Sequence, residues 1–507
     1  MTTPHLYITT TIPYVNARPH LGHALELVQA DVLARHHRGR GGQVRFQTGT
    51  DDNSLKNVLA AEAAGVGVQE FVDGNAAAFT ALAAPLSLSV DDVIHTSRDP
   101  RHRVGVERLW TACGRSGDLY RTHYEGLYCV GCEQFFTPAE LDHGRCPDHG
   151  TDPQRVSEEN WFFRLSRYGD RLHELIASGA LRIEPAERRN EVLAFIAGGL
   201  ADFSVSRSIS RAHGWGIPVP GDPGQVIYVW WDGLGNYLTA LGYGSRHDDL
   251  RRWWTGAARR IHLVGKGVLR FHAVYWPAML LSAGEALPTD ILVHDYLTIE
   301  GRKISKSGGG SVDPAGLIAE YGTDAVRWWL LREVPRVGDA DFAADRLVRR
   351  ANDELANGLG NLVNRVIAMV HRYRDGRPPV SDGPANGAGE LDQAIARAPG
   401  RVASALDDFD FRRATAAVWE IVDAANRYVN HVRPWELAAA ERGGDGPAGR
   451  DLDAVLAALV RACQTIAVQL TPFLPDAAAR VARQCAPVDG RLPAPSPVQG
   501  RLPADGA

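Results

Sequence analysis

The apolar positions near the N-terminus predict a strand, a helix and a second strand in succession. Residues 6–11 (LYITTT) are rich in β-forming side chains, and residues 21–38 carry apolar positions such as Leu25 and Val28 at helical spacing. Residues 44–47 have the composition of another strand. This β–α–β order favours a parallel sheet and an α/β fold.

The pattern changes in the middle of the chain. Residues 113–222 consist of short segments, aromatic clusters and grouped cysteines, which indicate an insertion. Strand-like runs return at 225–231 (QVIYVWW), 261–264 (IHLV) and 291–294 (ILVH). We expect the parallel sheet to resume there.

The rest of the chain is predicted to be helical. Amphipathic helices begin near residue 345, and Gly- and Pro-rich linkers interrupt them at 376–389 and 443–449. The last 20 residues are rich in Pro, Gly and Ala and predict a disordered tail. The expected units are therefore the first half of a sheet domain (1–112), the insertion (113–222), the second half of the sheet domain (223–344), a helical domain (345–487) and the tail (488–507).

Composition narrows the possible classes of protein. Of the 507 residues, 45% are hydrophobic and 23% are charged, as in ordinary globular proteins. No apolar run approaches the roughly 18 residues that a membrane span needs, and no signal peptide opens the chain, so we expect a cytoplasmic protein. The net charge of −5 excludes a bulk polycation, so any contact with nucleic acid must use local basic patches.

Lysine is rare in this chain. Of 55 basic residues only Lys56, Lys266, Lys303 and Lys306 are lysines. Arginine cannot easily imitate a compact ammonium on a flexible stem, so these four positions are candidates for functions that need lysine. The alternative is that four lysines remain by chance.

Two histidines flank a glycine where the first predicted helix begins. His20, Gly22 and His23 directly follow the first strand and a short loop. Backbone N–H groups and the helix dipole favour anions at a helix N-terminus, and imidazoles add further donors. The pattern suits a triphosphate. The alternative is a surface turn with two incidental histidines.

A second cationic segment occupies residues 301–310 (GRKISKSGGG). It combines Lys303 and Lys306 with two serines and a glycine run. A mobile loop of this kind can close over phosphates and stabilise the charge that develops on them. A flexible polar linker is the alternative, and it is less favoured because the chain has so few lysines.

Four soft or borderline ligands cluster in the insertion: Cys129, Cys132, Cys146 and His149. Two close pairs can complete a tetrahedral zinc site without an open position, which predicts a structural Zn²⁺. The remaining cysteines are scattered, so a secreted disulfide framework is not indicated.

The paired motifs resemble the HIGH-like and KMSKS-like signatures of class I aminoacyl-tRNA synthetases. Residues 5–487 look most like methionyl-tRNA synthetases of the bacterial type with a single zinc knuckle. The resemblance implies a Rossmann-like catalytic domain of parallel strands, split by a zinc-knuckle insertion and followed by an all-α helical-bundle anticodon-binding domain. It also implies an enzyme that activates methionine with ATP and Mg²⁺ and transfers it to the 3′ end of tRNA with a CAU anticodon.

The resemblance also implies roles for individual residues. His20 and His23 would contact phosphates with Gly22, while Lys303 and Lys306, with Ser305 and Ser307, would bind ATP and stabilise the transition state. The implied methionine pocket comprises Ile12, Tyr14, Asp51 as the partner of the ammonium group, Trp230, Gly233, Leu234, Tyr237 and His294. The implied anticodon-binding residues are Asn361, Arg365 and Trp435.

Several positions depart from the family pattern. Residues 50–54 read TDDNS and lack a usual His-Gly pair, Gly233 replaces alanine, and Gly235 is smaller than expected. Gly267 replaces aspartate, and Asp295 replaces glycine. These changes leave open a looser pocket or another amino acid, a paralogue with a non-tRNA acceptor, and a non-catalytic tRNA-binding protein. We expect a monomer.

Overall fold

A six-stranded parallel sheet organises the N-terminal part of the chain. The computed structural model describes residues 5–147, 149–245, 248–303, 312–381 and 385–503. The strand order is β3-β2-β1-β12-β13-β7, and every neighbouring pair is parallel. The expected α/β fold is thereby confirmed. The strands are β1 (His5–Thr10), β2 (Gln43–Thr50), β3 (Asp92–His95), β7 (Arg182–Glu184), β12 (Arg259–Gly265) and β13 (Asp290–His294).

The prediction that residues 225–231 form a strand of this sheet is wrong. Strand β11 (Asp222–Ile227) pairs with β9 and β10 in a separate antiparallel sheet, and helix α7 (Val229–Thr239) follows it. The run QVIYVWW therefore bridges a strand and a helix. A short apolar run that is buried on all sides does not distinguish the two by its periodicity.

The predicted insertion also contributes to the main sheet. Within residues 113–222, β7 joins the edge of the parallel sheet beside β13. The remaining strands of the insertion form a four-stranded antiparallel sheet in the order β5-β4-β6-β8 and part of the three-stranded sheet. The insertion is thus partly integrated into the parallel sheet rather than wholly separate from it.

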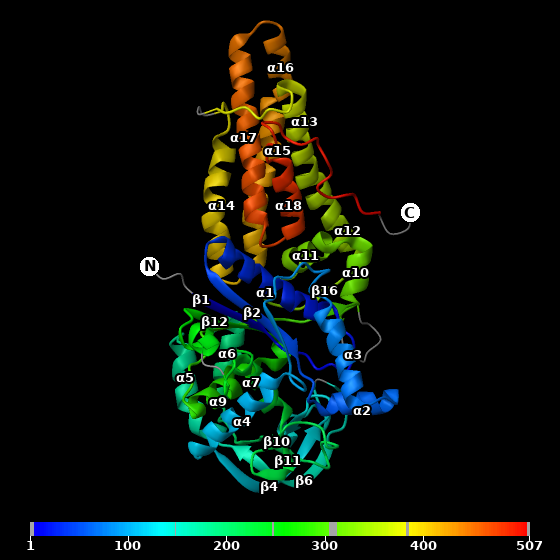
Figure 1. Cartoon of the computed structure of the whole chain (residues 1–507), viewed down its shortest axis with the longest axis vertical. Helices are drawn as coiled ribbons and strands as arrows, with labels where there is room; N and C mark the ends of the chain where they lie inside the picture. Colours follow the sequence, from blue (N-terminus) through cyan, green and yellow to red (C-terminus); the bar gives the residue numbers. More distant parts are fainter. Residues whose placement is uncertain (1–4, 148, 246–247, 304–311, 382–384, 504–507) are drawn as a thin grey trace.

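The described α-helices α12 to α18, with a π-helix between α12 and α13, form the C-terminal bundle. Figure 1 shows this bundle at one end of an elongated molecule, with the parallel sheet in the middle and strands β4, β6, β10 and β11 at the other end. The expected linker at 443–449 is shorter than predicted, because α17 begins at Gly446 and Asp445 caps it. Among the described helices, none has the length and apolar character that crossing a bilayer requires.

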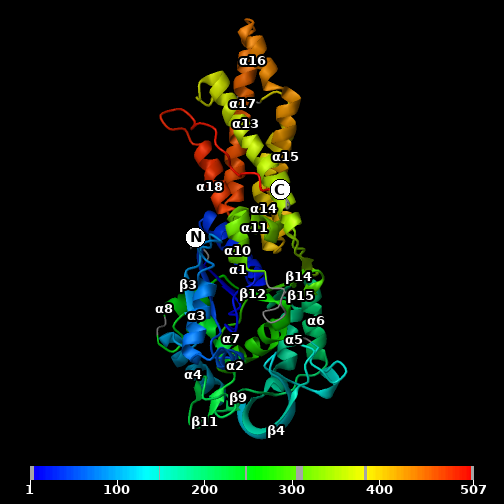
Figure 2. The same ribbon diagram turned by 90° about the vertical axis from the view of Figure 1, so that its right-hand side faces the viewer.

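The expected disordered tail is wrong for residues 488–503. This segment runs back along the bundle without regular secondary structure, and Figure 2 shows it beside α18 and α13. Leu492 and Val498 are each only 2% exposed. The Leu492 N–H donates to the Gly376 carbonyl at 2.8 Å, and Arg480 donates to the Val498 carbonyl at 2.6 Å. Two apolar side chains and paired backbone groups are enough to hold a sequence of disordered composition against the helices.

One continuous core joins the sheet domain to the bundle. It includes Leu25 of α1, Trp328 of α11 and Leu456 of α17. A wholly buried ion pair lies within this junction, where Arg327 contacts Asp31 at 2.9 Å. The site on the sheet and the far helices therefore share one packed support.

The other elements have the following bounds. Before the bundle they are α1 (Leu21–Gly39), α2 (Leu55–Ala64), α3 (Val68–Thr80), α4 (Pro100–Arg115), β4 (Leu119–Cys129), β5 (Gln134–Phe136), β6 (Gln154–Phe163), α5 (Gly169–Ala177), α6 (Ala186–Ala197), β8 (Phe203–Ser204), β9 (Ser206–Ser208), β10 (Pro218–Val219), α8 (Asp248–Leu250), α9 (Trp276–Ala283), β14 (Leu297–Ile299), β15 (Arg302–Lys303), α10 (Pro314–Tyr321), α11 (Thr323–Arg332) and β16 (Ala340–Asp341). In the bundle they are α12 (Ala344–Arg350), a π-helix (Ala351–Gly360), α13 (Asn361–Arg374), α14 (Gly389–Asp407), α15 (Phe411–Val432), α16 (Pro434–Arg442), α17 (Gly446–Leu470) and α18 (Pro475–Gln484).

Candidate active site

A cavity of about 350 Å³ lies where strands β1, β12 and β13 end. Ligands of open α/β sheets bind at this carboxyl edge. Segments that are far apart in the sequence therefore meet around one space. The predicted residues that line it are Ile12, Tyr14, His20, Gly22, His23, Asp51, Trp230, Gly233, Leu234, Tyr237 and His294.

The two histidines are held at the start of α1 by local hydrogen bonds. His20 Nδ1 accepts from the Gly22 N–H at 3.1 Å, and His23 Nδ1 accepts from the His20 N–H at 3.0 Å. A neutral ring whose Nδ1 accepts carries its proton on Nε2, so each ring retains a donor suited to an anion. Gly22 is needed for this arrangement, because a Cβ there would lie 2.9 Å from His20 Cε1.

The chain that follows the predicted phosphate-binding loop lies close to this helix start. Strand β15 leads into the loop, and the described chain resumes at Val312. The Val312 carbonyl accepts from the Leu21 N–H at 3.1 Å, so the returning chain lies against the first turn of α1. The loop residues Ser305, Lys306 and Ser307 lie outside the described residues, as does the side chain of Lys303.

Asp51 supplies a buried carboxylate to the cavity wall. Its N–H donates to the Pro13 carbonyl at 2.9 Å, and no group among the described residues donates to its Oδ1. Burial, followed by the charges of Asp232 and Glu133, raises the pKa of Asp51 well above its usual range. A buried acceptor without a donor is costly, and a substrate ammonium group would supply both the proton donor and the opposite charge.

Aromatic rings form another part of the cavity wall. Trp230 stacks on Phe271 with ring centroids 3.6 Å apart and planes 6° apart, and Tyr14 meets Trp230 edge-on at 6.1 Å. The Tyr237 hydroxyl lies 2.7 Å from His272 Nε2, and burial lowers the pKa of His272 to about 4, so this ring is neutral at pH 7. Such a wall binds an uncharged, polarisable side chain by shape and soft contacts.

The sequence analysis missed two of these residues. Phe271 and His272 lie in the segment 265–272 (GKGVLRFH), directly after β12. Their only sequence signal is a pair of ring residues following a glycine-flanked lysine at a strand end. Their place in the cavity depends on the π-helical turn at Phe271–Tyr275, which periodicity does not reveal.

His294 shares the cavity but has a different partner. Its Nε2 lies 2.9 Å from Glu26 Oε2, and Glu26 also accepts from the Thr11 N–H at 2.6 Å. Burial alone would lower the pKa of His294, but the hydrogen bond and charge of Glu26 outweigh it and raise that pKa. The sequence analysis did not single out Glu26, which lines the cavity as well.

The departures from the family pattern have unequal consequences. Gly233 lines the cavity, whereas a Cβ at Gly235 would face Val106 of α4 at 3.3 Å. Asp295 lines the cavity but is held by Arg188 and by the Gly338 N–H, the latter at 2.6 Å. The change at 235 therefore affects helix packing, whereas the changes at Gly233, Gly267 and Asp295 alter the cavity wall.

The four predicted metal ligands converge beside the same cavity. The ligand atoms of Cys129, Cys132, Cys146 and His149 lie within 4.8 Å of one another. The Cys132 and Cys146 sulfurs are 3.4 Å apart, and His149 Nδ1 lies 3.3 Å from Cys132 Sγ. A tetrahedron with Zn–S bonds of about 2.3 Å has edges of roughly 3.8 Å, so the donor set fits Zn²⁺. Cys132 and His149 also line the cavity.

The comparison with protein families agrees with this geometry. The model of the family described as tRNA synthetases class I (M) matches residues 6–157 and 137–367. The chain belongs to the class I tRNA synthetases.

This synthetase is similar along nearly its whole length to proteins named Methionine--tRNA ligase. It is 40% identical over 471 residues to that of Caldanaerobacter subterraneus subsp. tengcongensis, covering 93% of this chain and 72% of the relative. It is 39% identical over 481 residues to that of Brucella suis, covering 94% and 90%. The structure matches Mycobacterium tuberculosis methionyl-tRNA synthetase in complex with methionyl-adenylate with a TM-score of 0.93 and 36% identity, covering 98% of this chain and 100% of that chain.

In the bundle of this synthetase, the predicted anticodon residues occupy neighbouring helices. Arg365 of α13 donates to Asn430 Oδ1 of α15 at 3.1 Å. Trp435, five residues after Asn430, is the second residue of α16 and is 42% exposed. Asn361 is the exposed first residue of α13. Arg365 thus contacts the end of α15 that leads directly to Trp435.

Proposed function

We propose that this synthetase activates methionine with ATP and transfers it to tRNA that carries a CAU anticodon. The observation that carries this proposal is a single cavity lined by the histidine pair, the Asp51 carboxylate and the aromatic wall. These groups match the three parts of a methionyl-adenylate, namely its phosphate, its ammonium group and its thioether side chain.

The activation step forms one bond and breaks one. The methionine carboxylate attacks the α-phosphorus of ATP, and pyrophosphate leaves with the electrons of the broken P–O bond. The carboxylate is already a nucleophile, so catalysis requires mainly positioning and electrostatic stabilisation. His20 and His23 donate to the phosphates from the start of α1. Lys303 and Lys306 stabilise the departing pyrophosphate, which Mg²⁺ accompanies as the metal of ATP.

Selection of methionine follows from the two parts of the cavity wall, the Asp51 carboxylate and the aromatic rings. Asp51 pairs with the ammonium group, and the stacked rings of Trp230 and Phe271 enclose the side chain beside Tyr237 and neutral His272. A thioether accepts only weak hydrogen bonds, so shape and polarisable contacts carry the selection. Ile12, Leu234 and Gly233 complete the pocket.

Zinc and tRNA complete the proposal. One structural Zn²⁺ on Cys129, Cys132, Cys146 and His149 holds the knuckle that borders the cavity. Asn361, Arg365 and Trp435 read anticodon bases by hydrogen bonding and stacking, as unpaired RNA bases are commonly recognised. The contact between Arg365 and the end of α15 supports this assignment.

Two measurements test this function and separate it from its alternatives. Methionine-dependent exchange of pyrophosphate into ATP reports activation, and charging of a CAU-bearing tRNA reports transfer. Exchange together with charging is expected. Exchange without charging would favour a paralogue with another acceptor, and tRNA binding without exchange would favour a non-catalytic RNA-binding protein.

A further inference from the structure

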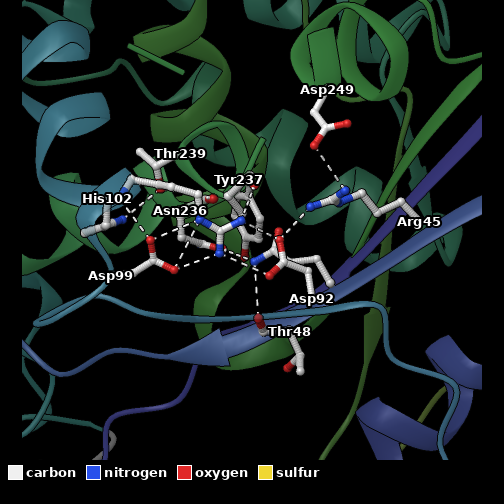
Figure 3. A network of polar contacts seen from close by, with 12 residues as sticks. Arg45, Thr48, Asp92, Asp99, His102, Asn236, Tyr237, Thr239 and Asp249 are labelled. Atoms are coloured by element: carbon white, nitrogen blue, oxygen red, sulfur yellow. Dashed lines mark hydrogen bonds and ion pairs between the residues drawn. The ribbon is translucent and has the colours of Figure 1, made fainter. Parts of the chain in front are cut away.

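Helix α7 has a second, polar face opposite its cavity face. Trp230, Gly233, Leu234 and Tyr237 line the cavity. Asp232, Asn236 and Thr239 follow the helical spacing on the other side and are at most 1% exposed. Figure 3 shows His102 beside Thr239, and Asn236 next to Tyr237.

Asp232 is the centre of the contacts on this polar face. One of its carboxylate oxygens contacts His102 Nε2, and the other accepts from Asn53 Nδ2 at 2.6 Å. His102 Nδ1 lies 2.8 Å from the Thr239 hydroxyl. His102 and Asp232 are both wholly inaccessible to solvent. Buried polar groups with complete partners fix the relative positions of the elements that carry them.

Asn53 links this cluster to the substrate-facing carboxylate. It lies two residues after Asp51, in the segment that Asn57 holds by donating to the Asp51 carbonyl at 3.0 Å. Asp51 itself lies directly against α7, because a Cβ on Gly233 would be 2.7 Å from Asp51 Oδ2. The Asn53–Asp232 hydrogen bond therefore joins the Asp51 segment to α7. On α7 this bond lies one residue before Gly233, which faces the Asp51 carboxylate.

We propose that Asn53 and His102, acting through Asp232, are positioning residues that hold the Asp51 carboxylate and α7 at the separation an amino-acid ammonium group needs. This inference rests on the proposed function, since it concerns the amino acid of the activation step. Neither residue contacts the substrate. Both residues influence the position of one carboxylate, that of Asp51. Substituting them should therefore weaken the binding only of ligands that carry an α-ammonium group.

Asn53→Ala tests this restriction by pyrophosphate exchange and by competitive inhibition. We expect the KM for methionine to rise on the order of 10-fold with kcat within about 2-fold, since the ammonium contact is made equally before and in the transition state. The inhibition constant of methioninol, which keeps the ammonium group, should rise in parallel. That of 4-(methylthio)butanoate, which lacks it, should stay unchanged. Equal weakening of both inhibitors would overturn the proposal, because it would indicate general support of the pocket.

A charge-conserving exchange of the two partners provides the matched control. Asn53→Asp places a second carboxylate against Asp232 and should raise the KM for methionine more than Asn53→Ala does. In the double variant Asn53→Asp with Asp232→Asn, the amide at 232 donates to residue 53 while its oxygen accepts from His102. We expect this pair to recover most of the lost affinity for methionine, with an unchanged KM for ATP. A double variant no better than Asn53→Asp alone would overturn the proposal.

The proposed function itself is judged separately in this experiment. Absence of methionine-dependent exchange in the unaltered protein would count against the proposed function. The positioning role of Asn53 and His102 is then tested by calorimetric measurement of the binding of methioninol and 4-(methylthio)butanoate to the same variants. Selective loss of methioninol supports the positioning role, and parallel loss contradicts it.

Discussion

Among the titratable side chains that line the cavity, Asp51, His272 and His294 have pKa values that their surroundings move in different directions. Burial raises the pKa of Asp51 and lowers that of His272, whereas Glu26 raises that of His294 against the effect of burial. At neutral pH the His272 ring, which contacts Tyr237, is uncharged and therefore suits an uncharged thioether side chain. Glu26 stabilises the charged form of the His294 ring and so raises its pKa. One cavity thus contains a neutral and a cation-stabilising environment, set by neighbours rather than by residue type.

Asp51→Asn tests the ammonium assignment. The substitution keeps the shape but removes the charge, and a hydrogen bond between charged groups contributes about 1.5–3 kcal/mol. We expect the KM for methionine to rise on the order of 100-fold. In the unaltered enzyme that KM should rise as pH falls through the raised pKa, because protonated Asp51 no longer attracts an ammonium group. The variant should lack this pH dependence. If the KM of the variant for methionine kept the pH dependence of the unaltered enzyme, Asp51 would not be the group that causes that dependence.

The same substitution should stabilise the fold at neutral pH. The pKa of Asp51 is higher in the folded than in the unfolded chain, so the unfolded chain releases this proton first as pH rises. The carboxyl group therefore lowers stability increasingly above its ordinary pKa of about 3.9. We expect Asp51→Asn to melt at least about 2 °C above the unaltered protein at pH 7, with the gap closing toward pH 4. Calorimetry at both pH values measures it, and a gap independent of pH would contradict the explanation.

At the scale of elements, the sequence predicts what periodicity and spacing can carry. Residues 21–38 show a clear helical pattern, and α1 spans Leu21–Gly39. The cysteine spacing likewise predicted a ligand cluster that the structure brings together. The first turn of α7 was included in a predicted strand because the run QVIYVWW is almost entirely apolar. Phe271 and His272 were missed because a π-helical turn directs them to the cavity. Both failures concern segments whose neighbours, not their own pattern, determine their conformation.

The knuckle is expected to shape the cavity as well as to bind zinc. Cys132 and His149 line the cavity, and the buried Glu133 next to them accepts from the Ser54 hydroxyl at 2.8 Å. We expect one equivalent of zinc by atomic spectroscopy, lost in Cys146→Ser together with most of the pyrophosphate exchange. Cys113→Ser changes a buried thiol outside the cluster and should keep its zinc. Zinc-free protein with undiminished exchange would show that the knuckle does not support this cavity.

At the scale of the whole molecule, sheet domain and bundle form one body. Arg327 of α11 contacts Asp31 of α1 at 2.9 Å and donates to the Leu86, Phe473 and Pro472 carbonyls at 2.8, 2.8 and 3.1 Å. A buried ion pair with its partners complete contributes little net stability, but removing one partner is costly. Its position fixes the angle between the bundle and the cavity.

Trp435→Ala separates the two ends of the molecule functionally. The exposed ring belongs to α16, which Figure 1 shows at the end of the bundle away from the sheet. Loss of one stacking contact with an unpaired base costs about 1–3 kcal/mol. We therefore expect the kcat/KM for charging to fall by roughly 5- to 150-fold, while methionine-dependent exchange stays within about 2-fold. Equal losses in both assays would remove Trp435 from the anticodon site.

The C-terminal segment offers a test of whether it belongs to the folded molecule. Val498 is 2% exposed and Val488 is 66% exposed, so the same substitution at both compares a buried with a solvated position. We expect Val498→Ala to lower the free energy of unfolding by about 2 kcal/mol, because it removes buried methyl groups and leaves a cavity. Val488→Ala should change it by less than about 0.5 kcal/mol. Urea unfolding followed by circular dichroism measures both. Equal, small effects of the two substitutions would show that this segment is disordered in solution, as its composition predicts. Asn352, which accepts from the Leu502 N–H at 2.8 Å, would then lack this partner in solution.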